Sequence, residues 1–306
     1  MSHAAGMKPR IPLPPPLDRS PFTRAEGLSA GLGKRRVDGS DLLRPYRGVR
    51  HPVAIPLTLE ARCRAFATRM RSDAFFNSIT AAGLMGLPLP RAMQNNPTLH
   101  VAVPAPSRSL QVRGVVGHKV QLMGNDWRDW HGLRVSTPER VWCELAALLP
   151  LPDLVAVGDY LIHWERPICS MVELAAATER FMGRRGRAVL RTALAQLDDH
   201  SESPQESRLR VVLALAGIDG LVANLRITVR GKTYRADLAL PKWKVAIEYQ
   251  SDYHRDVGQW RKDMTKRESI ASVGWLTMEV NADDLDVGPE LAARVRAVLS
   301  LRPTFD

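Results

Sequence analysis

The chain has few cysteines and no long apolar run. Its three cysteines, Cys63, Cys143 and Cys169, lie far apart, and no two of them form a Cys-x-x-Cys pair. This spacing argues against a disulfide framework and against a cysteine-based zinc site, and it favours inert thiols in a reducing compartment. No stretch of about 18 apolar residues occurs, so a membrane span is not expected. The N-terminus also lacks the apolar core of a signal peptide, so the expected location is the cytoplasm.

Basic residues, by contrast, are in excess. Lysine and arginine together number 43 against 32 acidic residues, which gives a formal net charge of +11. The corresponding pI is about 10.0. A balance of this size is typical of proteins that bind a polyanion, and nucleic acid is the commonest one. A genome that favours arginine over lysine raises the pI in the same way without any function, so charge alone leaves both explanations open.

The domain organisation follows from length and composition. The 306 residues are about twice the length of a typical domain, so two folded domains are expected. Residues 1–50 are rich in proline, glycine and basic residues and have no apolar period, which predicts a disordered basic tail. The polar stretch 198–205, DDHSESPQ, predicts a linker. The expected domains are therefore residues 51–200 and residues 201–306.

The first of these domains is predicted to be mainly helical. Residues 57–71 have helical spacing, and a second helix begins near Ser78 and ends at Gly86. Two helices joined by a tight turn are typical of a helix-turn-helix or winged-helix unit. Alternating β-formers predict short strands at 99–103, 112–122 and 133–135. Further helices are expected from Pro138 onward, at 153–163, 170–182 and 186–198.

The second domain is predicted to be α/β, with the element order α-β-β-β-α-β-α. Within it, two strand-like runs flank Pro241-Lys242, so a two-residue hairpin is expected in which Leu240 pairs with Trp243. Side chains two apart on a strand share a face, and the hairpin therefore places Asp237, Glu248 and Gln250 on one side of the sheet. A three-residue loop would reverse this parity.

Two acids held together in apolar strands suggest a cation site. Asp237 and Glu248 would repel each other, and neither would ionise easily unless a cation lay between them. Mg²⁺ prefers carboxylate oxygens, and it can polarise a phosphate and lower the pKa of a bound water. Taken as an isolated pair, however, two acids on a solvated sheet face are the more ordinary explanation.

A longer pattern surrounds this pair. In order along the chain it comprises Arg235-Ala236-Asp237-Leu238-Ala239, Pro241, Glu248-Tyr249-Gln250-Ser251, His254-Arg255, Trp260-Arg261, Asp263, Arg267 and Gly274-Trp275. From Glu206 to the C-terminus the chain resembles a bacterial family related to the very-short-patch-repair endonucleases. The resemblance implies a PD-(D/E)XK restriction-endonuclease-like core and a DNA endonuclease that depends on Mg²⁺ or Mn²⁺.

The resemblance also implies roles for individual residues. Asp237 and Glu248 would hold the metal, Glu206 would assist them, and Gln250 would position water. The phosphate site would be shaped by three further residues, His254, Asp263 and Arg267. Arg267 also falls on the core-facing stripe of its helix. There it would reach the acidic cluster or a bound phosphate, or else it would form an ordinary buried salt bridge, for example with Asp263. Two positions stand apart: Ser251 occurs where the family usually has glycine, and Gln250 stands in place of a lysine, so it can orient a water or a phosphate but supplies no charge.

A second resemblance concerns the first domain. Residues 78–90, 99–104 and 132–146 are similar to the winged-helix part of abortive-infection type IV antitoxins, which implies binding of duplex DNA through the major groove. Protein–protein docking is the rival role, with a second copy of the chain or a toxin-like protein as partner. The alternative function is thus a non-catalytic, antitoxin-like transcriptional regulator that binds DNA and retains a degenerate nuclease fold.

Overall fold

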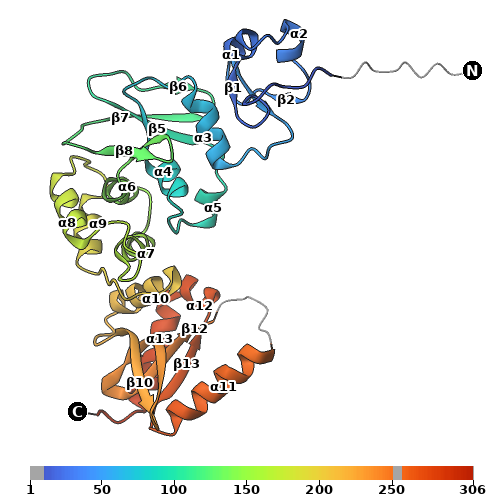
Figure 1. The fold of residues 1–306 in the computed structure, drawn as a ribbon. Coiled ribbons are helices and arrows are strands. Elements are labelled where there is room, and N and C mark those ends of the chain that lie inside the picture. The colour runs from blue at the N-terminus through green and yellow to red at the C-terminus, as the bar shows by residue number, and fades with distance from the viewer. Residues whose placement is uncertain (1–9, 251–256, 306) are drawn as a thin grey trace, which may run out of the picture. The chain divides into compact units, whose positions relative to one another are not determined.

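The chain folds into two compact units. The structure, a computed structural model, describes residues 10–250 and 257–305, and of residues 257–262 it describes the backbone alone. Unit 1 comprises Met1–Gly86 and Arg91–Thr137, and unit 2 comprises Leu87–Pro90 and Pro138–Asp306. The ribbon of each unit is shown in Figure 1. No helix in the described part of the chain is long and apolar enough to cross a membrane.

The first part of unit 1 is a small folded lobe. Its three strands form a sheet in the order β1-β3-β2, and Thr23 and Glu26 form a capping box that starts the first helix. A core of Leu17, Phe22, Leu32, Val37 and Leu42 holds the lobe together. Residues 10–50 are therefore folded, contrary to the prediction of a disordered tail, because apolar residues without any period can still meet in space. The elements are β1 (Phe22–Thr23), α1 (Arg24–Ser29), α2 (Lys34–Val37), β2 (Leu42–Leu43) and β3 (Val49–Pro52).

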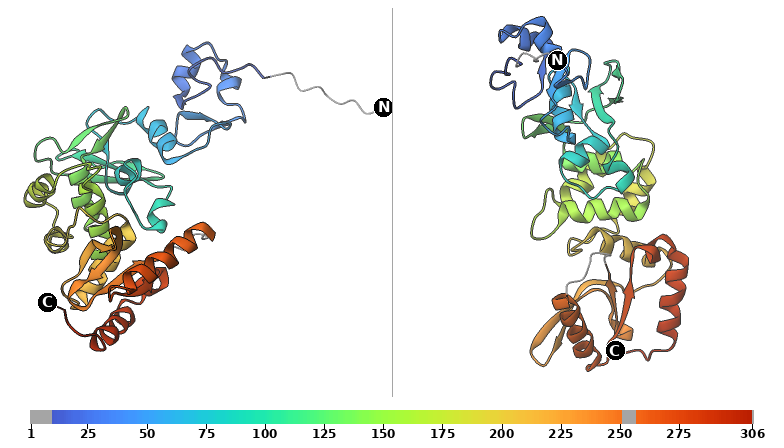
Figure 2. Two further views of the ribbon diagram at one scale, coloured as in Figure 1. Left: turned by 60° about the horizontal axis from the view of Figure 1, so that its bottom comes forward. Right: turned by 90° about the vertical axis from the view of Figure 1, so that its right-hand side faces the viewer.

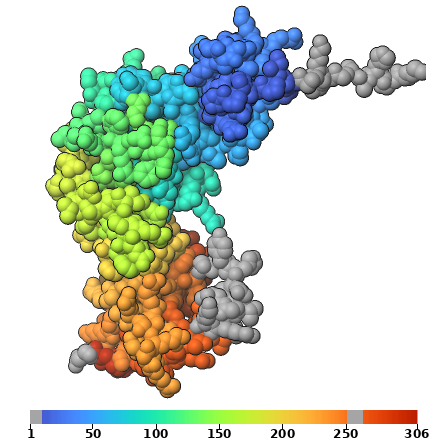
Figure 3. Space-filling model, in the orientation of Figure 1, coloured from blue at the N-terminus to red at the C-terminus, as the bar shows by residue number. Residues whose placement is uncertain are grey.

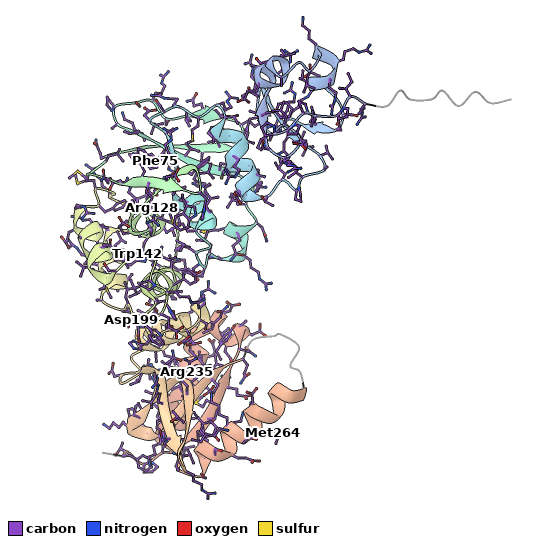
Figure 4. All side chains as sticks on the ribbon, in the orientation of Figure 1. Phe75, Arg128, Trp142, Asp199, Arg235 and Met264 are labelled. Atoms are coloured by element: carbon purple, nitrogen blue, oxygen red, sulfur yellow. The ribbon has the colours of Figure 1, made fainter. Side chains whose placement is uncertain are left out.

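The second part of unit 1 is built on a six-stranded mixed sheet, in the order β6-β7-β5-β4-β9-β8. Its core includes Phe66, Phe75 and Phe76, and Phe75 is labelled in Figure 4. The strands predicted near 99–103, 112–122 and 133–135 are confirmed. The elements are α3 (Leu59–Ala67), β4 (Phe75–Phe76), α4 (Ser78–Leu84), α5 (Arg91–Gln94), β5 (Leu99–Pro104), β6 (Gln111–Val112), β7 (Val115–Val120), β8 (Trp127–Trp130) and β9 (Leu133–Ser136).

This sheet overturns the helix-turn-helix prediction for unit 1. Between the helices α3 and α4 the chain enters the sheet as β4, which pairs with both β5 and β9. The two helices are therefore not joined by a tight turn, and residues up to Thr137 are not mainly helical. Phe75 and Phe76 are both fully buried, which explains why a two-residue segment belongs to the sheet.

Unit 2 begins with a helical segment that packs on the rest of the unit. Its helices are α6 (Pro138–Leu145), α7 (Leu151–Ile162), α8 (Met171–Arg180) and α9 (Arg187–Leu194), as predicted. The helix α10 (Pro204–Leu215) packs along α7. Arg210 on α10 donates to Asp159 on α7 at 2.7 Å, and the two segments are in contact in the space-filling view (Figure 3). The two compact units therefore divide near residue 138, and not near residue 200 where the polar stretch predicted a boundary.

The C-terminal part of unit 2 is α/β and follows the predicted element order. A four-stranded sheet has the order β10-β11-β12-β13, with β12 and β13 parallel and the other pairs antiparallel. The helices α10 and α13 pack against one face, and α11 packs against the other (Figures 1 and 2). The elements are β10 (Val222–Val229), β11 (Lys232–Leu240), η1 (Pro241–Trp243), β12 (Val245–Tyr249), α11 (Val257–Ala271), β13 (Leu276–Val280), α12 (Ala282–Asp286) and α13 (Gly288–Ser300).

The hairpin between β11 and β12 differs from the prediction by two residues. The turn η1 and Lys244, whose φ is 48°, form a four-residue connection, so Leu240 pairs with Val245 and not with Trp243. Continuing this register brings Asp237 opposite Glu248, whereas the two-residue turn would have placed it opposite Ala246. Adding two residues keeps the parity, and for that reason Asp237 and Glu248 still lie on the same side.

Candidate active site

Four polar residues occupy neighbouring positions on the four strands of the C-terminal sheet, and we call them the polar row. Glu248 on β12 pairs with Glu279 on β13. Asp237 on β11 follows next to Glu248 in register, and the pairs on either side of Asn224 place it next to Asp237 on β10. The sheet therefore gathers three acids and an amide that lie far apart in the sequence.

The side-chain alternation of β11 is interrupted at the polar row. Ala236 and Ala239 pack toward α11, whereas Leu238 packs toward α10 and α13. Residues 236 and 238 would share a face in a regular strand, so the strand turns at Asp237. Its neighbour Asn224 has a φ of 52°, a left-handed conformation that asparagine tolerates better than most residues. The polar row therefore lies where β10 and β11 depart from regular strand geometry.

Glu248 is the most buried acid of the row. Its Oε2 accepts a hydrogen bond from Lys266 Nζ on α11 at 2.5 Å. Its Oε1 is buried and has no hydrogen-bond partner among the described residues. Burial and the negative charge of Asp237 raise the pKa of Glu248 to about 7, although Lys266 opposes the shift. A cation beside Oε1 would therefore satisfy an atom that the described residues leave unpaired.

Asp237 is partly buried beside Glu248. Its Oδ2 accepts a hydrogen bond from the backbone N–H of Tyr249 at 2.9 Å, which fixes the carboxylate across the end of the hairpin. Burial raises the pKa of Asp237, and the Tyr249 hydrogen bond and the charge of Lys266 oppose this shift. The charges of Lys266 and Asp263 on α11 shift the pKa of both carboxyl groups, and Asp237 and Glu248 therefore both face α11.

Glu206 approaches the row from the first turn of α10. It accepts hydrogen bonds from Ser203 Oγ at 2.8 Å, from the Glu202 N–H at 3.2 Å and from Asn224 Nδ2 at 3.2 Å. Burial, and then the charge of Asp237, raise the pKa of Glu206. The structure thus brings the predicted Glu206 to the acid pair, with Asn224 as its contact on the sheet.

Gln250 and Arg267 lie at the rim of the site, around Glu279. Gln250 Nε2 donates to Glu279 Oε1 at 3.1 Å, and Arg267 forms an ion pair with the same oxygen. Arg267 therefore forms a salt bridge, as one of the two predictions for it expected, but its partner is Glu279 of the polar row and not Asp263. Gln250, Asp263 and Arg267 also line a cavity of about 20 Å³ together with Glu248 and Lys266.

Three residues of this site were not predicted, namely Lys266, Asn224 and Glu279. Lys266 follows Asp263 by three positions on a helix, so placing Asp263 at the site could have placed Lys266 there as well. Asn224 and Glu279 carry no comparable signal, because their positions depend on strand pairing. His254, which was predicted to contact the phosphate, lies outside the described residues.

The donor atoms of the site suit a hard divalent cation. Asp237 and Glu248 offer carboxylate oxygens, and the Oδ1 of Asn224 is a second buried oxygen without a hydrogen-bond partner in the described part of the chain. A separate group of three ligand-type residues lies in the loop before α10 and does not include the acid pair. In the described part of the chain, the donor atoms of Asp198, Asp199 and His200 lie within 4.8 Å of one another. The acid pair would therefore hold an ion through two carboxylates, as Mg²⁺ sites often do.

Comparison with known proteins gives relatives without a stated activity. No protein-family model matches the chain. It is 28% identical over 225 residues to two curated proteins of Mycobacterium tuberculosis, "Uncharacterized protein MT2308" of strain CDC 1551 / Oshkosh and "Uncharacterized protein Rv2248" of strain ATCC 25618 / H37Rv. These matches cover 71% of this chain and 78% of each relative. A solved structure, the crystal structure of RV2827C protein from Mycobacterium tuberculosis, matches 63% of this chain and 75% of its own with a TM-score of 0.40 and 16% identity.

Proposed function

We propose that the protein is a DNA endonuclease that depends on Mg²⁺ or Mn²⁺ and acts in the cytoplasm. In this proposal the C-terminal part of unit 2 is a PD-(D/E)XK core. The observation that carries it is the acid pair, in which Asp237 and Glu248 face each other on adjacent strands. Burial raises the pKa of both carboxyl groups, and Glu248 Oε1 has no hydrogen-bond partner among the described residues. Such a pair is costly for a fold unless a cation binds to it.

Asp237 and Glu248 would hold the metal ion. When bound, the ion supplies a Lewis acid for the phosphate oxygen and lowers the pKa of a coordinated water. The Tyr249 N–H holds Asp237 in place by a 2.9 Å hydrogen bond, which leaves its other oxygen to face the site. Glu206, which accepts a hydrogen bond from Asn224, lies beside the pair and adds a third carboxylate to it.

Lys266 supplies the positive charge that Gln250 cannot. The related nuclease pattern has lysine at the position of Gln250, and here the amide of Gln250 is held at the rim by Glu279. The Lys266 ammonium reaches the acid pair from the helix α11 and contacts Glu248. A fixed cation at that place can stabilise the negative charge that develops on a phosphate during hydrolysis. In this proposal the positive charge that the nuclease pattern takes from a lysine at the position of Gln250 comes instead from Lys266 on the helix α11.

DNA is the substrate that fits the charge of the chain. The formal net charge of +11 favours binding to a polyanion. Binding of this kind weakens with salt, by a log–log slope on the order of −0.9 per neutralised phosphate for duplex DNA. We expect the affinity of the full chain for duplex DNA, measured without divalent metal, to fall with salt concentration in this way. Failure to bind duplex at low salt would contradict any role on DNA.

The second candidate function is a non-catalytic DNA-binding regulator. The specific observation that favours it is Gln250, which is neutral and engaged with Glu279. Thermal melting with and without metal separates the two functions, because a ligand that binds the native state raises its stability. A nuclease site should give a Mg²⁺- or Mn²⁺-dependent rise in Tm that Glu248→Gln removes, and a degenerate site should give none.

The proposed function is tested by a cleavage screen. Plain, mismatched, methylated and branched duplex DNA should each be incubated with the full chain and Mg²⁺ or Mn²⁺, and products resolved on a denaturing gel. We expect cleavage of at least one substrate, which EDTA abolishes. Cleavage that persists in the Asp237→Asn variant would show a contaminating nuclease and contradict the assignment of the site.

A further inference from the structure

Five exposed arginines lie close together in the sequence where the helix α8 ends and the helix α9 begins. We call them the arginine surface, and they are Arg180, Arg184, Arg185, Arg187 and Arg191. The stretch 180–197 contains no acidic residue. The two helices pack against each other within unit 2 and are labelled in Figure 1. The stretch lies outside the segments that resemble the endonuclease family and the antitoxins.

The five guanidinium groups are not neutralised by neighbouring acids. Among the side chains that the structure describes, none forms a hydrogen bond or an ion pair with any of the five. Arg294 on α13, in contrast, forms an ion pair with Asp284 at 2.8 Å. Arg187 and Arg191 are four positions apart on α9, where like charges repel each other. The arginine surface is therefore a concentration of positive charge that a bound anion would stabilise.

The loop between α8 and α9 is held in place by its other residues. The guanidinium group of Arg140 on α6 stacks over the Phe181 ring, 5.8 Å from its centroid. Gly186 has a φ of 81°, and a Cβ there would lie 2.5 Å from the carbonyl group of Ala146, so its backbone packs directly against the end of α6. Phe181 and Gly186 thus anchor the loop to α6, whereas Arg184 and Arg185 between them extend into solvent.

The helix α9 offers charge but no free apolar face. Leu190 and Ala193 are buried, and α9 packs along α7. Met182 is the large apolar side chain of the stretch 180–197 that is exposed. A helix that binds to a membrane surface needs an apolar face to insert into the lipid. The arginine surface therefore suits a partner with many phosphates and little apolar area, which describes the backbone of duplex DNA.

We propose that the arginine surface binds the phosphate backbone of duplex DNA. This inference rests on the proposed function for the identity of the partner, because DNA is the polyanion on which the acid pair would act. The guanidinium group is a planar fork that binds two phosphate oxygens at once. Phosphate contacts fix the position and orientation of a protein on the duplex and carry no sequence information directly. The arginine surface therefore provides binding that does not depend on sequence, and other residues select the site of cleavage.

The test measures binding of the full chain to a short fluorescein-labelled duplex by anisotropy, in EDTA and over a range of KCl concentrations. In the variant that carries Arg184→Gln, Arg185→Gln and Arg187→Gln, we expect the log–log salt slope to become shallower by about 0.9 for each arginine removed. Affinity should fall equally for two duplexes of unrelated sequence. Lysine at the same three positions should keep most of the slope, because counterion release depends on charge.

The matched control removes the same charge from unit 1 through Arg91→Gln, Arg108→Gln and Arg113→Gln, which are also at exposed positions. Its slope and affinity should stay close to those of the parent chain. Equal flattening in both triple variants would overturn the proposal, because net charge and not the arginine surface would then decide binding. Unchanged binding in the arginine-surface variant would overturn it as well. If that variant melted below the parent, Arg185→Glu alone should still weaken binding.

Vesicles of phosphatidylcholine with phosphatidylserine distinguish DNA from a lipid surface. We expect the parent chain to bind the duplex and to stay in solution when the vesicles are sedimented at the same salt concentration. Arginine-dependent sedimentation with the vesicles, without duplex binding, would overturn the proposal in favour of an anionic membrane.

The outcome is distinguishable from failure of the nuclease assignment. Asp237→Asn should abolish cleavage in Mg²⁺ and leave duplex binding in EDTA intact. If no substrate is cleaved but binding depends on the arginine surface, the nuclease proposal fails and the DNA-binding surface stands. If cleavage occurs and the arginine-surface variant binds like the parent, the DNA-binding surface fails and the nuclease proposal stands.

Discussion

Lys266 Nζ lies 2.5 Å from Glu248 Oε2, and this contact joins the helix α11 to the strand β12. Both side chains are largely shielded from water, with 23% of the lysine and 12% of the glutamate exposed. The ammonium offsets part of the repulsion between Glu248 and Asp237, and it lowers the pKa of both carboxyl groups against the effect of burial. Among the described side chains Lys266 is the cation that contacts the acid pair, and its single charge leaves a net negative charge for a metal ion to neutralise.

We expect Lys266→Met to lower the rate of metal-dependent cleavage by about 10²–10³-fold, because removing one preorganised charge donor from an active site costs roughly this much. Lys266→Arg should restore part of the rate. The matched control is Lys242→Met, which removes an exposed lysine from the turn between β11 and β12. Single-turnover cleavage measures the effect. A rate that Lys266→Met leaves unchanged would show that the charge is not used in the reaction.

Asp237→Asn and Glu248→Gln should each abolish cleavage, and the double variant should be no worse than either single one. Groups that act as a unit on one metal ion are strongly non-additive. Isothermal titration with Mn²⁺ should show loss of metal binding in the same three variants. Two partial losses that multiply in the double variant would mean that the acids act independently and do not share an ion.

The buried ion pair between Asp159 and Arg210 should hold the helical segment to the α/β part of unit 2. Asp159 is 1% exposed at its side chain, and Arg210 is 12% exposed. Burial raises the pKa of Asp159 to about 6, although Arg210 opposes the shift. Asp159→Ala leaves the arginine without this partner, and we expect the free energy of unfolding to fall by about 3 kcal/mol.

The same variant tests the position of the domain boundary. Hydrogen exchange should show faster opening in both α7 and α10, because the two helices belong to one folded unit. Arg166→Met, which removes an exposed arginine after α7, serves as the control and should change neither helix. Faster exchange confined to α7 would support the boundary near residue 200 that the polar linker indicated.

His100 should make unit 1 sensitive to acid. It is buried, and Nδ1 lies 3.0 Å from His118 Nε2 on the neighbouring strand. Burial, with the charge of His118, lowers the pKa of His100 from 6.5 to about 4. Because the folded state takes up the proton less readily than the unfolded state, stability is complete above pH 6.5 and is lost as the pH falls toward 4.

The loss from His100 should approach about 3 kcal/mol at pH 4, given 1.36 kcal/mol for each pKa unit. Urea unfolding of the parent chain and of His100→Gln at several pH values measures it. The variant should lose less stability than the parent over this interval, whereas His131→Asn, at an exposed site in the same unit, should behave like the parent. Parallel pH curves for parent and His100→Gln would contradict the prediction.

The sequence alone determined the local features of the site. Alternation along two strands placed Asp237 and Glu248 on one side of the sheet, and this holds because side-chain parity survives any change of the turn by two residues. Helix and strand order in the last third followed from periodicity and from the stop at Gly217. Glu206 was expected at the site from the family resemblance, and in the structure it lies in the first turn of α10, after the capping residue Ser203.

Only the tertiary structure decided which distant residues complete the site and where the units divide. Lys266, Asn224 and Glu279 meet the acid pair through helix packing and strand pairing, and no local pattern encodes either. The polar stretch before α10 indicated a linker, yet Arg210 and Asp159 form a buried ion pair across it. The physical reason is the same in both cases. Burial and ion pairing depend on which surfaces pack together in space, whereas hydrophobic periodicity indicates only that a helix or strand has an apolar face.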